Sequence, residues 1–215
     1  MGEIIPLAQH DRLPGRFAGR PARRSPRVVF FFDLACPFTY LAAERVERLL
    51  DTVEWRPAFA DALLGGSPAS DPLAGERMRR AARERAAALR LPLVWPERYP
   101  SSLRAAMRAA ASAAEQGRGG GFALAASRLA FCGGFDLDDP EVLAEAAAAA
   151  GVGLTECLAA AGDESRDGAM EAAGRRLLAA GADRLPALRV GRLLFAGEER
   201  VAEAAAAARR PLALA

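Results

Sequence analysis

Lysine and asparagine do not occur in the 215-residue sequence, and histidine occurs once, at His10. Arginine therefore supplies all 29 basic side chains, which 27 acidic ones nearly balance to leave a net charge of +2. This balance provides no global attraction to nucleic acid or to an anionic membrane, so neither is expected as a partner. Because the single histidine lies near the start of the chain, a Ser-His or Cys-His catalytic pair is nearly excluded.

Cysteine is also scarce, and no apolar run approaches the roughly 20 residues needed to cross a membrane. Cys36, Cys132 and Cys157 are an odd number without metal-like spacing, so neither a disulfide framework nor a metal site is expected. Residues 1–26 contain arginines and prolines but no apolar block of the kind that a signal peptide requires. We therefore predict a mobile or surface-lying N-terminal arm and a cytoplasmic protein, whose thiols stay reduced.

The hydrophobic pattern after this arm begins with alternating element types. Residues 27–32 form a short apolar run that is typical of a strand buried on both faces. Residues 37–50 follow a helical period with Pro37 at the first position, and residues 52–59 resemble a second strand. Strand, helix and strand in this order predict a βαβ unit with a parallel strand pair.

Helical signals dominate from residue 61 to about residue 181, and strands return only near the end of the chain. Residues 187–190 and 193–195 are separated by Gly-Arg, which predicts a hairpin, and a closing helix follows. These patterns predict an α/β fold in three parts, namely the arm over 1–26, one domain formed by 27–60 plus 170–215, and an inserted all-helical domain over 61–169.

The predicted helix that ends near Arg90 is rich in arginine. A solvated helix face is the simpler interpretation of this pattern. Contact between these arginines and an anionic substrate is the alternative.

One cysteine lies at the junction between the first strand and the first helix. In the stretch FDLACPFTY, Cys36 follows the apolar run and precedes Pro37. A helix N-terminus exposes unpaired N–H groups and carries a partial positive charge, which stabilises a thiolate relative to a free thiol with a pKa of about 8.5. Cys36 is therefore a candidate nucleophile, and the alternative is a small buried residue at a strand end.

Three stretches are informative when they occur together in this order: FDLACPFTYLA, EQGRGGGFALAASRLAFCGGFDLDDPEVLAEAA and RLPALRVGRLLFAGEER. They resemble the DsbA-like group of thioredoxin-fold proteins over nearly the whole patterned chain. Within that group they are similar to the FrnE-like oxidoreductases, the 2-hydroxychromene-2-carboxylate isomerases and the kappa-class glutathione transferases. The resemblance implies a thioredoxin fold, in which βαβ and ββα halves flank a large helical insertion.

The resemblance also assigns roles within the motif Cys-Pro-Phe-Thr. DsbA-like oxidoreductases have Cys-x-x-Cys, but here Thr39 occupies the position of the resolving thiol, which leaves monothiol exchange through mixed disulfides. Thr39 is expected to hydrogen-bond the Cys36 thiolate. Pro37 is expected to open the helix beside the reacting sulfur, and Phe38 to contact the substrate.

The third stretch implies a second half of the site. In this family the proline that corresponds to Pro186 is cis, and Leu185 before it would pair its backbone with an extended thiol substrate. The alternative is an ordinary proline at the start of a strand.

Three acidic residues are further substrate-binding candidates. The turn at 197–200 matches the place where the kappa and isomerase branches receive the γ-glutamyl end of glutathione, which would involve Glu198 and Glu199. Capping of the last helix is the alternative for both. Asp33 could tune Cys36 or cap its turn, or contact the substrate.

These features predict a DsbA-like thiol-disulfide oxidoreductase that uses Cys36. The first alternative is a glutathione-dependent isomerase or transferase, although those branches have serine at the position of Cys36 and use an asparagine that this sequence lacks. The second is a non-catalytic binding module. We expect no tightly bound cofactor and a thiol or disulfide substrate. Glutathione or another small thiol is the expected cosubstrate, and a homodimer is the expected assembly.

Overall fold

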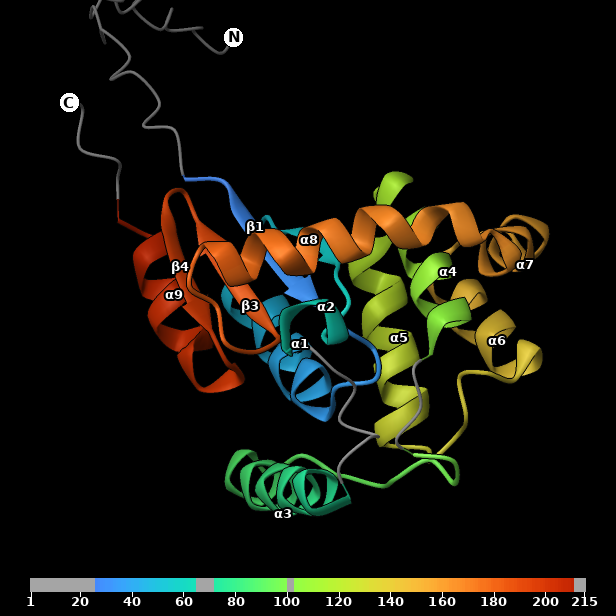
Figure 1. Ribbon diagram of the computed structural model, residues 1–215, viewed down its shortest axis with the longest axis horizontal. Coiled ribbons are helices and arrows are strands. Elements are labelled where there is room, and N and C mark those ends of the chain that lie inside the picture. Colours follow the sequence, from blue (N-terminus) through green and yellow to red (C-terminus); the bar gives the residue numbers. More distant parts are fainter. Residues whose placement is uncertain (1–25, 65–71, 100–102, 211–215) are drawn as a thin grey trace, which may run out of the picture.

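The structure is a computed structural model that describes residues 26–64, 72–99 and 103–210. The predicted N-terminal arm lies outside the described residues apart from Pro26. Both ends of the described chain lie at the same end of the molecule (Figure 1).

A four-stranded mixed sheet forms the centre of the βαβ and ββα halves. Its strands are β1 (Val28–Phe32), β2 (Glu54–Pro57), β3 (Ala187–Val190) and β4 (Leu193–Ala196), in the order β2-β1-β3-β4. β1 runs parallel to β2 and antiparallel to β3, which pairs antiparallel with β4. This is the thioredoxin arrangement, so the predicted fold class is confirmed.

Side chains of β1 alternate between two hydrophobic clusters, and all five residues of this strand are buried. Phe30 and Phe32 belong to the main cluster, whereas Val29 and Phe31 belong to a smaller one. The main cluster lies between the sheet and the helices α1 (Pro37–Leu49) and α9 (Val201–Ala208), and it continues among the helices between residues 104 and 157. A strand covered on both faces needs apolar residues at every position, which explains the continuous run in the sequence.

The smaller cluster is closed by α2 (Asp61–Leu64) and α8 (Asp167–Ala179). Gly174 allows α8 to approach the chain after β2, because a Cβ atom there would lie 2.7 Å from the Phe59 carbonyl oxygen. α8 also crosses the domain boundary predicted at residue 170, and the division into two domains stays a prediction.

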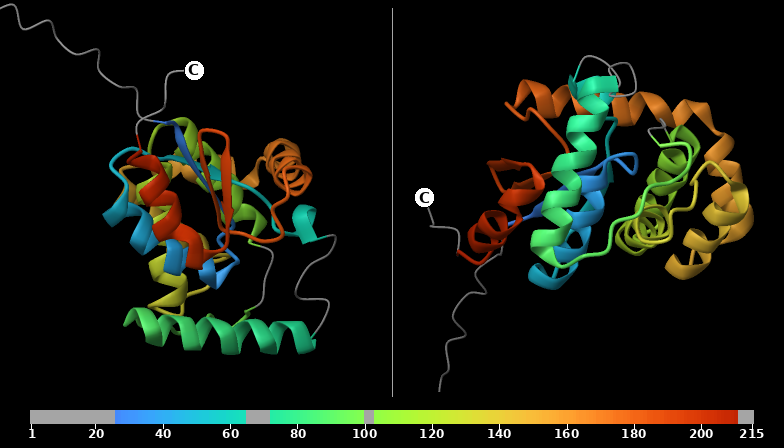
Figure 2. Two further views of the ribbon diagram at one scale, coloured as in Figure 1. Left: turned by 90° about the vertical axis from the view of Figure 1, so that its left-hand side faces the viewer. Right: turned by 90° about the horizontal axis from the view of Figure 1, so that it is seen from below.

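The remaining helices form the predicted helical segment beside the sheet (Figures 1 and 2). α5 packs against α1 and α6, and α4 packs against α7 and β2. Alanines at 106, 109, 110 and 113 on α4 are all buried, which permits close helix contacts. The helices of this segment are α3 (Pro72–Leu89), α4 (Arg104–Glu115), α5 (Gly119–Phe131), α6 (Pro140–Ala150) and α7 (Leu154–Gly162). Two short 3-10 turns are η2 (Glu164–Arg166) and η3 (Glu198–Arg200).

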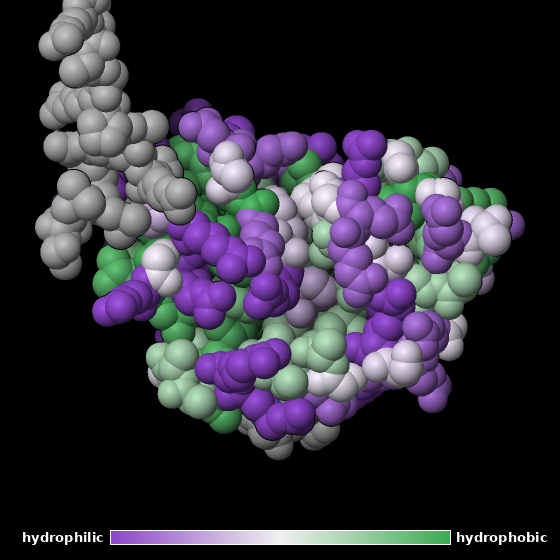
Figure 3. Space-filling view, turned by 90° about the horizontal axis from the view of Figure 1, so that it is seen from above, coloured by the Kyte–Doolittle hydropathy of each residue, from purple (hydrophilic) through white to green (hydrophobic). Residues whose placement is uncertain are grey.

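Hydrophilic and hydrophobic residues are interspersed over the face seen from above (Figure 3). Within the described ranges, no helix is both long enough and apolar enough to cross a membrane.

α3 lies along α1 at the bottom of the view in Figure 1, and a buried carboxylate joins these two helices to η3. The side chain of Glu198 is 1% exposed and pairs with Arg45 of α1 and with Arg85 of α3, whose Nε lies 2.5 Å from Glu198 Oε2. Arg45 also donates to the Glu198 carbonyl oxygen at 2.9 Å. One carboxylate therefore compensates two cations from different parts of the chain.

We expect Glu198→Gln to lower the free energy of unfolding by about 2–4 kcal/mol, because it leaves two guanidinium groups without their counter-charge while Arg85 keeps some contact with water. Urea denaturation followed by circular dichroism measures this change. Glu203→Gln is the matched control, since Glu203 pairs with Arg200 at the surface. Equal effects of both substitutions would contradict a structural role for the buried pair.

Candidate active site

Cys36 is the last residue before α1, at the end of the loop that follows β1. Its backbone is extended (φ −93°, ψ 118°), and Pro37 occupies the first turn of the helix. The Cys36 amide donates to the Asp33 carbonyl oxygen at 3.1 Å, and the Thr39 amide donates to the Cys36 carbonyl oxygen at 2.9 Å. The local sequence thus places the thiol at the helix N-terminus.

Sheet pairing brings the Leu185-Pro186 segment to the same place. β3 pairs with β1 so that Ala187 lies opposite Phe31, and the peptide between Leu185 and Pro186 is cis. Cys36 Sγ lies 3.6 Å from the Leu185 carbonyl oxygen. Two segments separated by 149 residues therefore meet at the sulfur.

Thr39 is fully buried one turn into α1. Its Oγ1 accepts a hydrogen bond from the Asp33 amide at 3.3 Å, so its own proton remains available for another acceptor. The Thr39 hydroxyl hydrogen-bonds Cys36 and lowers the pKa of that thiol. Thr39 thus takes the predicted place beside the sulfur, as a hydrogen-bond donor.

Asp33 joins two loops next to the site. Its Oδ1 accepts from the Ala35 amide and its Oδ2 from the Ala60 amide, both at 2.9 Å. Burial raises the pKa of the Asp33 carboxyl to about 6, although these two amides lower it. Both carboxylate oxygens are already engaged with backbone, so Asp33 holds the loop and does not have the substrate-binding role considered above.

The expected lowering of the Cys36 pKa is wrong. Burial of the thiol raises its pKa to about 11, and the charge of Asp33 adds to this rise. Amides of Thr39 and Phe38 lower the pKa but do not compensate. Cys36 as a residue is half-buried, but burial of its sulfur outweighs the hydrogen bonds at the start of α1 and favours the protonated thiol.

The two glutamates of the last turn lie in different environments. Glu198 is buried against Arg45, which follows Cys36 by nine residues and hence lies about 13 Å along the helix axis. Its predicted substrate-binding role is therefore wrong, because its carboxylate is already paired. Glu199 is exposed, and its Oε1 lies 3.7 Å from Arg184 Nη1, next to Leu185.

Phe38, the remaining candidate of the motif, is half-buried and packs against the main hydrophobic cluster. This contact gives Phe38 a place in the core beside the helix start. Its expected contact with substrate stays a prediction.

Sequence reasoning missed the side chains that the helical segment contributes. The Leu34 amide donates to Met107 Sδ of α4 at 3.3 Å, which brings this helix to the loop before Cys36. Tyr99 is buried, which raises the pKa of its hydroxyl, and ionised Cys36 and Asp33 raise that pKa further. No local pattern marks these residues, because only the packing of the insertion brings them to the thiol.

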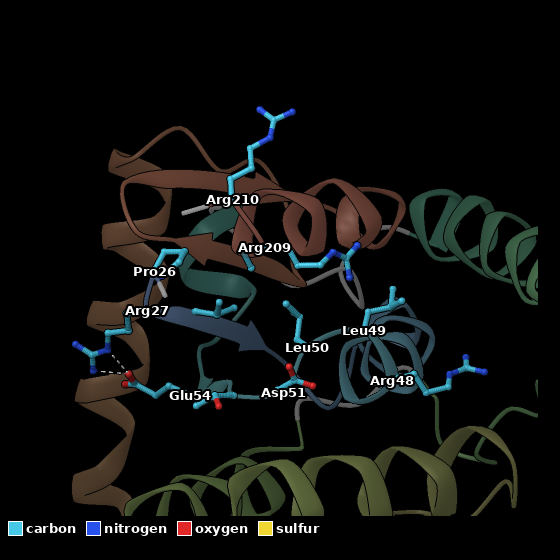
Figure 4. Close-up of a pocket in the computed structure, with 12 residues that line it drawn as sticks. Pro26, Arg27, Arg48, Leu49, Leu50, Asp51, Glu54, Arg209 and Arg210 are labelled. Carbon is cyan, nitrogen blue, oxygen red and sulfur yellow. Dashed lines mark hydrogen bonds and ion pairs between the residues drawn. The ribbon is translucent and has the colours of Figure 1, made fainter. Parts of the chain in front are cut away.

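A cavity of about 950 Å³ lies at the other end of α1, between the C-terminal ends of α1 and α9 (Figure 4). Arg48, Asp51 and Arg209 line it, whereas Cys36 precedes the first turn of α1. Since α1 has 13 residues and is about 20 Å long, this cavity does not belong to the thiol site. Among the described residues, no group of three or more His, Cys, Asp or Glu side chains could hold a metal ion.

Comparison with known proteins agrees with this geometry. A family model for the DSBA-like thioredoxin domain matches residues 27–207. The chain belongs to the DSBA-like thioredoxin family. No curated protein matches the sequence.

Two solved structures show the same fold. A 2-hydroxychromene-2-carboxylate isomerase is similar with a TM-score of 0.68 and 17% identity, over 84% of this chain and 93% of that one. A probable DsbA oxidoreductase from Streptomyces coelicolor is similar with a TM-score of 0.62 and 22% identity, over 88% and 94% of the two chains. Because both identities are below 25%, these two structures show the fold and do not assign a reaction to this chain.

We predict that Asp33→Asn increases the rate of Cys36 alkylation at pH 8 by about three- to tenfold, because removal of a neighbouring negative charge lowers the pKa of the thiol. Iodoacetamide labelling between pH 6 and 11, followed by mass spectrometry, measures the rate. In the unsubstituted protein the rate should rise throughout this range, since the thiol has a pKa of about 11.

Asp61→Asn is the control for this experiment. The charge of Asp61 raises the pKa of Asp33 but is not among the influences on Cys36, so its removal should leave the Cys36 rate nearly unchanged. A rate that levels off near pH 7 in the unsubstituted protein would contradict the assigned electrostatics.

Proposed function

We propose that the protein is a monothiol DsbA-like thiol-disulfide oxidoreductase with Cys36 as its nucleophile. The observation that carries this proposal is the sulfur of Cys36 at the start of α1, 3.6 Å from the Leu185 carbonyl oxygen and with Thr39 at the resolving position. The helix amides can stabilise a thiolate, and the Leu185 backbone is the proposed partner of an extended substrate.

The proposed reaction has two steps. The Cys36 thiolate attacks one sulfur of a disulfide, so that the substrate S–S bond breaks, a mixed disulfide forms on Cys36, and the other sulfur leaves as a thiolate. The proton lost by Cys36 is balanced by the proton that this leaving group takes up. A second thiol then attacks the mixed disulfide, forms a new disulfide and returns Cys36 to the reduced state.

The high pKa of the resting thiol makes substrate binding part of this mechanism. A bound disulfide places its sulfur where charge develops, while the Thr39 hydroxyl and the first amides of α1 stabilise the attacking sulfur. Glutathione or another small thiol is the proposed cosubstrate. The cytoplasmic location and a homodimer stay predictions.

The second candidate is a thiol-dependent isomerase or transferase. Exposed Glu199 favours it, because this carboxylate lies beside Arg184 and the Leu185 peptide, where the γ-glutamyl end of glutathione was expected. The fold similarity to 2-hydroxychromene-2-carboxylate isomerase is consistent with it. In that case a small thiol would be the cofactor, and Cys36 would only assist.

Incubation with glutathione disulfide, followed by intact-mass measurement, tests the oxidoreductase. We expect one glutathionyl group on Cys36 and its release by added thiol, and Cys36→Ser should abolish this adduct while Cys132→Ser should retain it. Isomerisation of a hydroxychromene carboxylate with added glutathione that survives Cys36→Ser would favour the isomerase. A Cys36 that forms no adduct, in a protein without isomerase activity, would indicate the binding module.

We predict that Thr39→Cys converts the site to a dithiol. The two positions are three apart at a helix start and about 5–6 Å from each other, within reach of a disulfide. The variant should close an internal disulfide on mild oxidation, visible as the loss of two free thiols, and should then oxidise a dithiol peptide without external thiol. Thr39→Ser keeps the hydroxyl and serves as control. Equal dithiol oxidation by the unsubstituted protein would contradict the monothiol assignment.

A further inference from the structure

Two arginines of α3 lie over the aromatic side chains of the segment that follows this helix. Arg79 lies 5.5 Å from the ring centre of Trp95 and 5.3 Å from that of Tyr99. Arg83, one turn further along α3, lies 5.9 Å from the Trp95 ring. Arg79 also donates to the Tyr99 carbonyl oxygen at 2.5 Å, which fixes one side of its guanidinium.

This cluster adjoins the candidate active site. Tyr99 and Tyr40 both pack on Phe131, with ring centres 6.0 and 6.3 Å away, and Tyr40 follows Cys36 by four residues on α1. Burial raises the pKa of Tyr99, an ionised Cys36 raises it further, and the charge of Arg79 lowers it. Tyr99 therefore links Arg79 to the region of the sulfur.

Arg79 and Arg83 differ from neighbouring arginines in their lack of acidic partners. Arg80 pairs with Glu84, and Arg85 pairs with Glu198. Within residues 26–64, 72–99 and 103–210, neither Arg79 nor Arg83 has an ion pair. Arg79 is half-buried and Arg83 exposed, so α3 carries, next to Trp95, two positive charges without an acidic partner among the described residues.

One polar atom in the aromatic part of this cluster also lacks a hydrogen-bond partner among the described residues. This atom is the Trp95 indole Nε1, which is buried. A flat ligand with an acidic group suits such a surface, because arginine binds carboxylates through paired N–H groups while the rings provide apolar contact.

We propose that Arg79 and Arg83 form an anion-binding subsite, so that the thiol or disulfide substrate of Cys36 carries a carboxylate, with Trp95 and Tyr99 as its apolar wall. This inference rests on the proposed thiol exchange at Cys36. It identifies the substrate class as anionic thiols or disulfides, and it gives α3 of the helical insertion a role in substrate selection.

Two disulfide reagents test the proposal in a Cys132→Ser background. One is the dianion 5,5′-dithiobis(2-nitrobenzoate), and the other is the neutral 2,2′-dithiodipyridine. We expect the ratio of the two Cys36 reaction rates, anionic over neutral, to fall about tenfold in the variant Arg79→Gln/Arg83→Gln. The preference of the unsubstituted site for the anion should also weaken as salt is added.

Arg80→Gln is the matched control, because it removes one positive charge from the same helix but from a residue that is already paired with Glu84. The ratio should change little in this variant. Arg83→Gln alone, at an exposed side chain, keeps the test valid if loss of Arg79 disturbs folding, and circular dichroism of each variant identifies such a disturbance.

The outcomes separate the two proposals. An unchanged ratio in the arginine variants, or an equal fall with Arg80→Gln, would overturn the subsite while leaving thiol exchange intact. If Cys36 reacts with neither reagent, the proposed function itself is overturned and the subsite falls with it.

Discussion

Two hydrogen bonds to the Asp33 carboxylate hold the turn on which the site depends. They join the Ala35 amide, in the loop before α1, to the Ala60 amide after β2, and Thr39 returns from the helix to the Asp33 amide. The sulfur of Cys36 consequently has a defined position relative to the cis segment at Leu185. The carboxylate that orders this loop also places a negative charge near the thiol.

Cys36 therefore experiences opposing influences. Helix amides and the Thr39 hydroxyl favour a thiolate, whereas burial and Asp33 favour the protonated thiol and prevail. Such a balance suits the proposed nucleophile, because during thiol exchange the negative charge is shared between two sulfurs. It also explains why position at a helix N-terminus alone does not predict the charge of a thiol.

The helical insertion contributes to the site as well as enlarging the core. α4 contacts the loop before Cys36 through Met107, and α3 is tied to α1 through the buried Glu198. The same helix presents Arg79 and Arg83 above Trp95 and Tyr99. In the proposed enzyme, α3 would take part in substrate choice while the thioredoxin half holds Cys36 in place.

The sequence by itself determined the strands around Phe30 and Leu188, the helix that begins at Pro37, and the position of Cys36 before it, because local hydrophobic period and helix-start residues specify these features. Only the tertiary structure decided the charge state of Cys36, the pairing of Glu198 and the approach of Tyr99. Desolvation and ion pairing depend on atoms that are distant in sequence, so no pattern of neighbouring residues could reveal them.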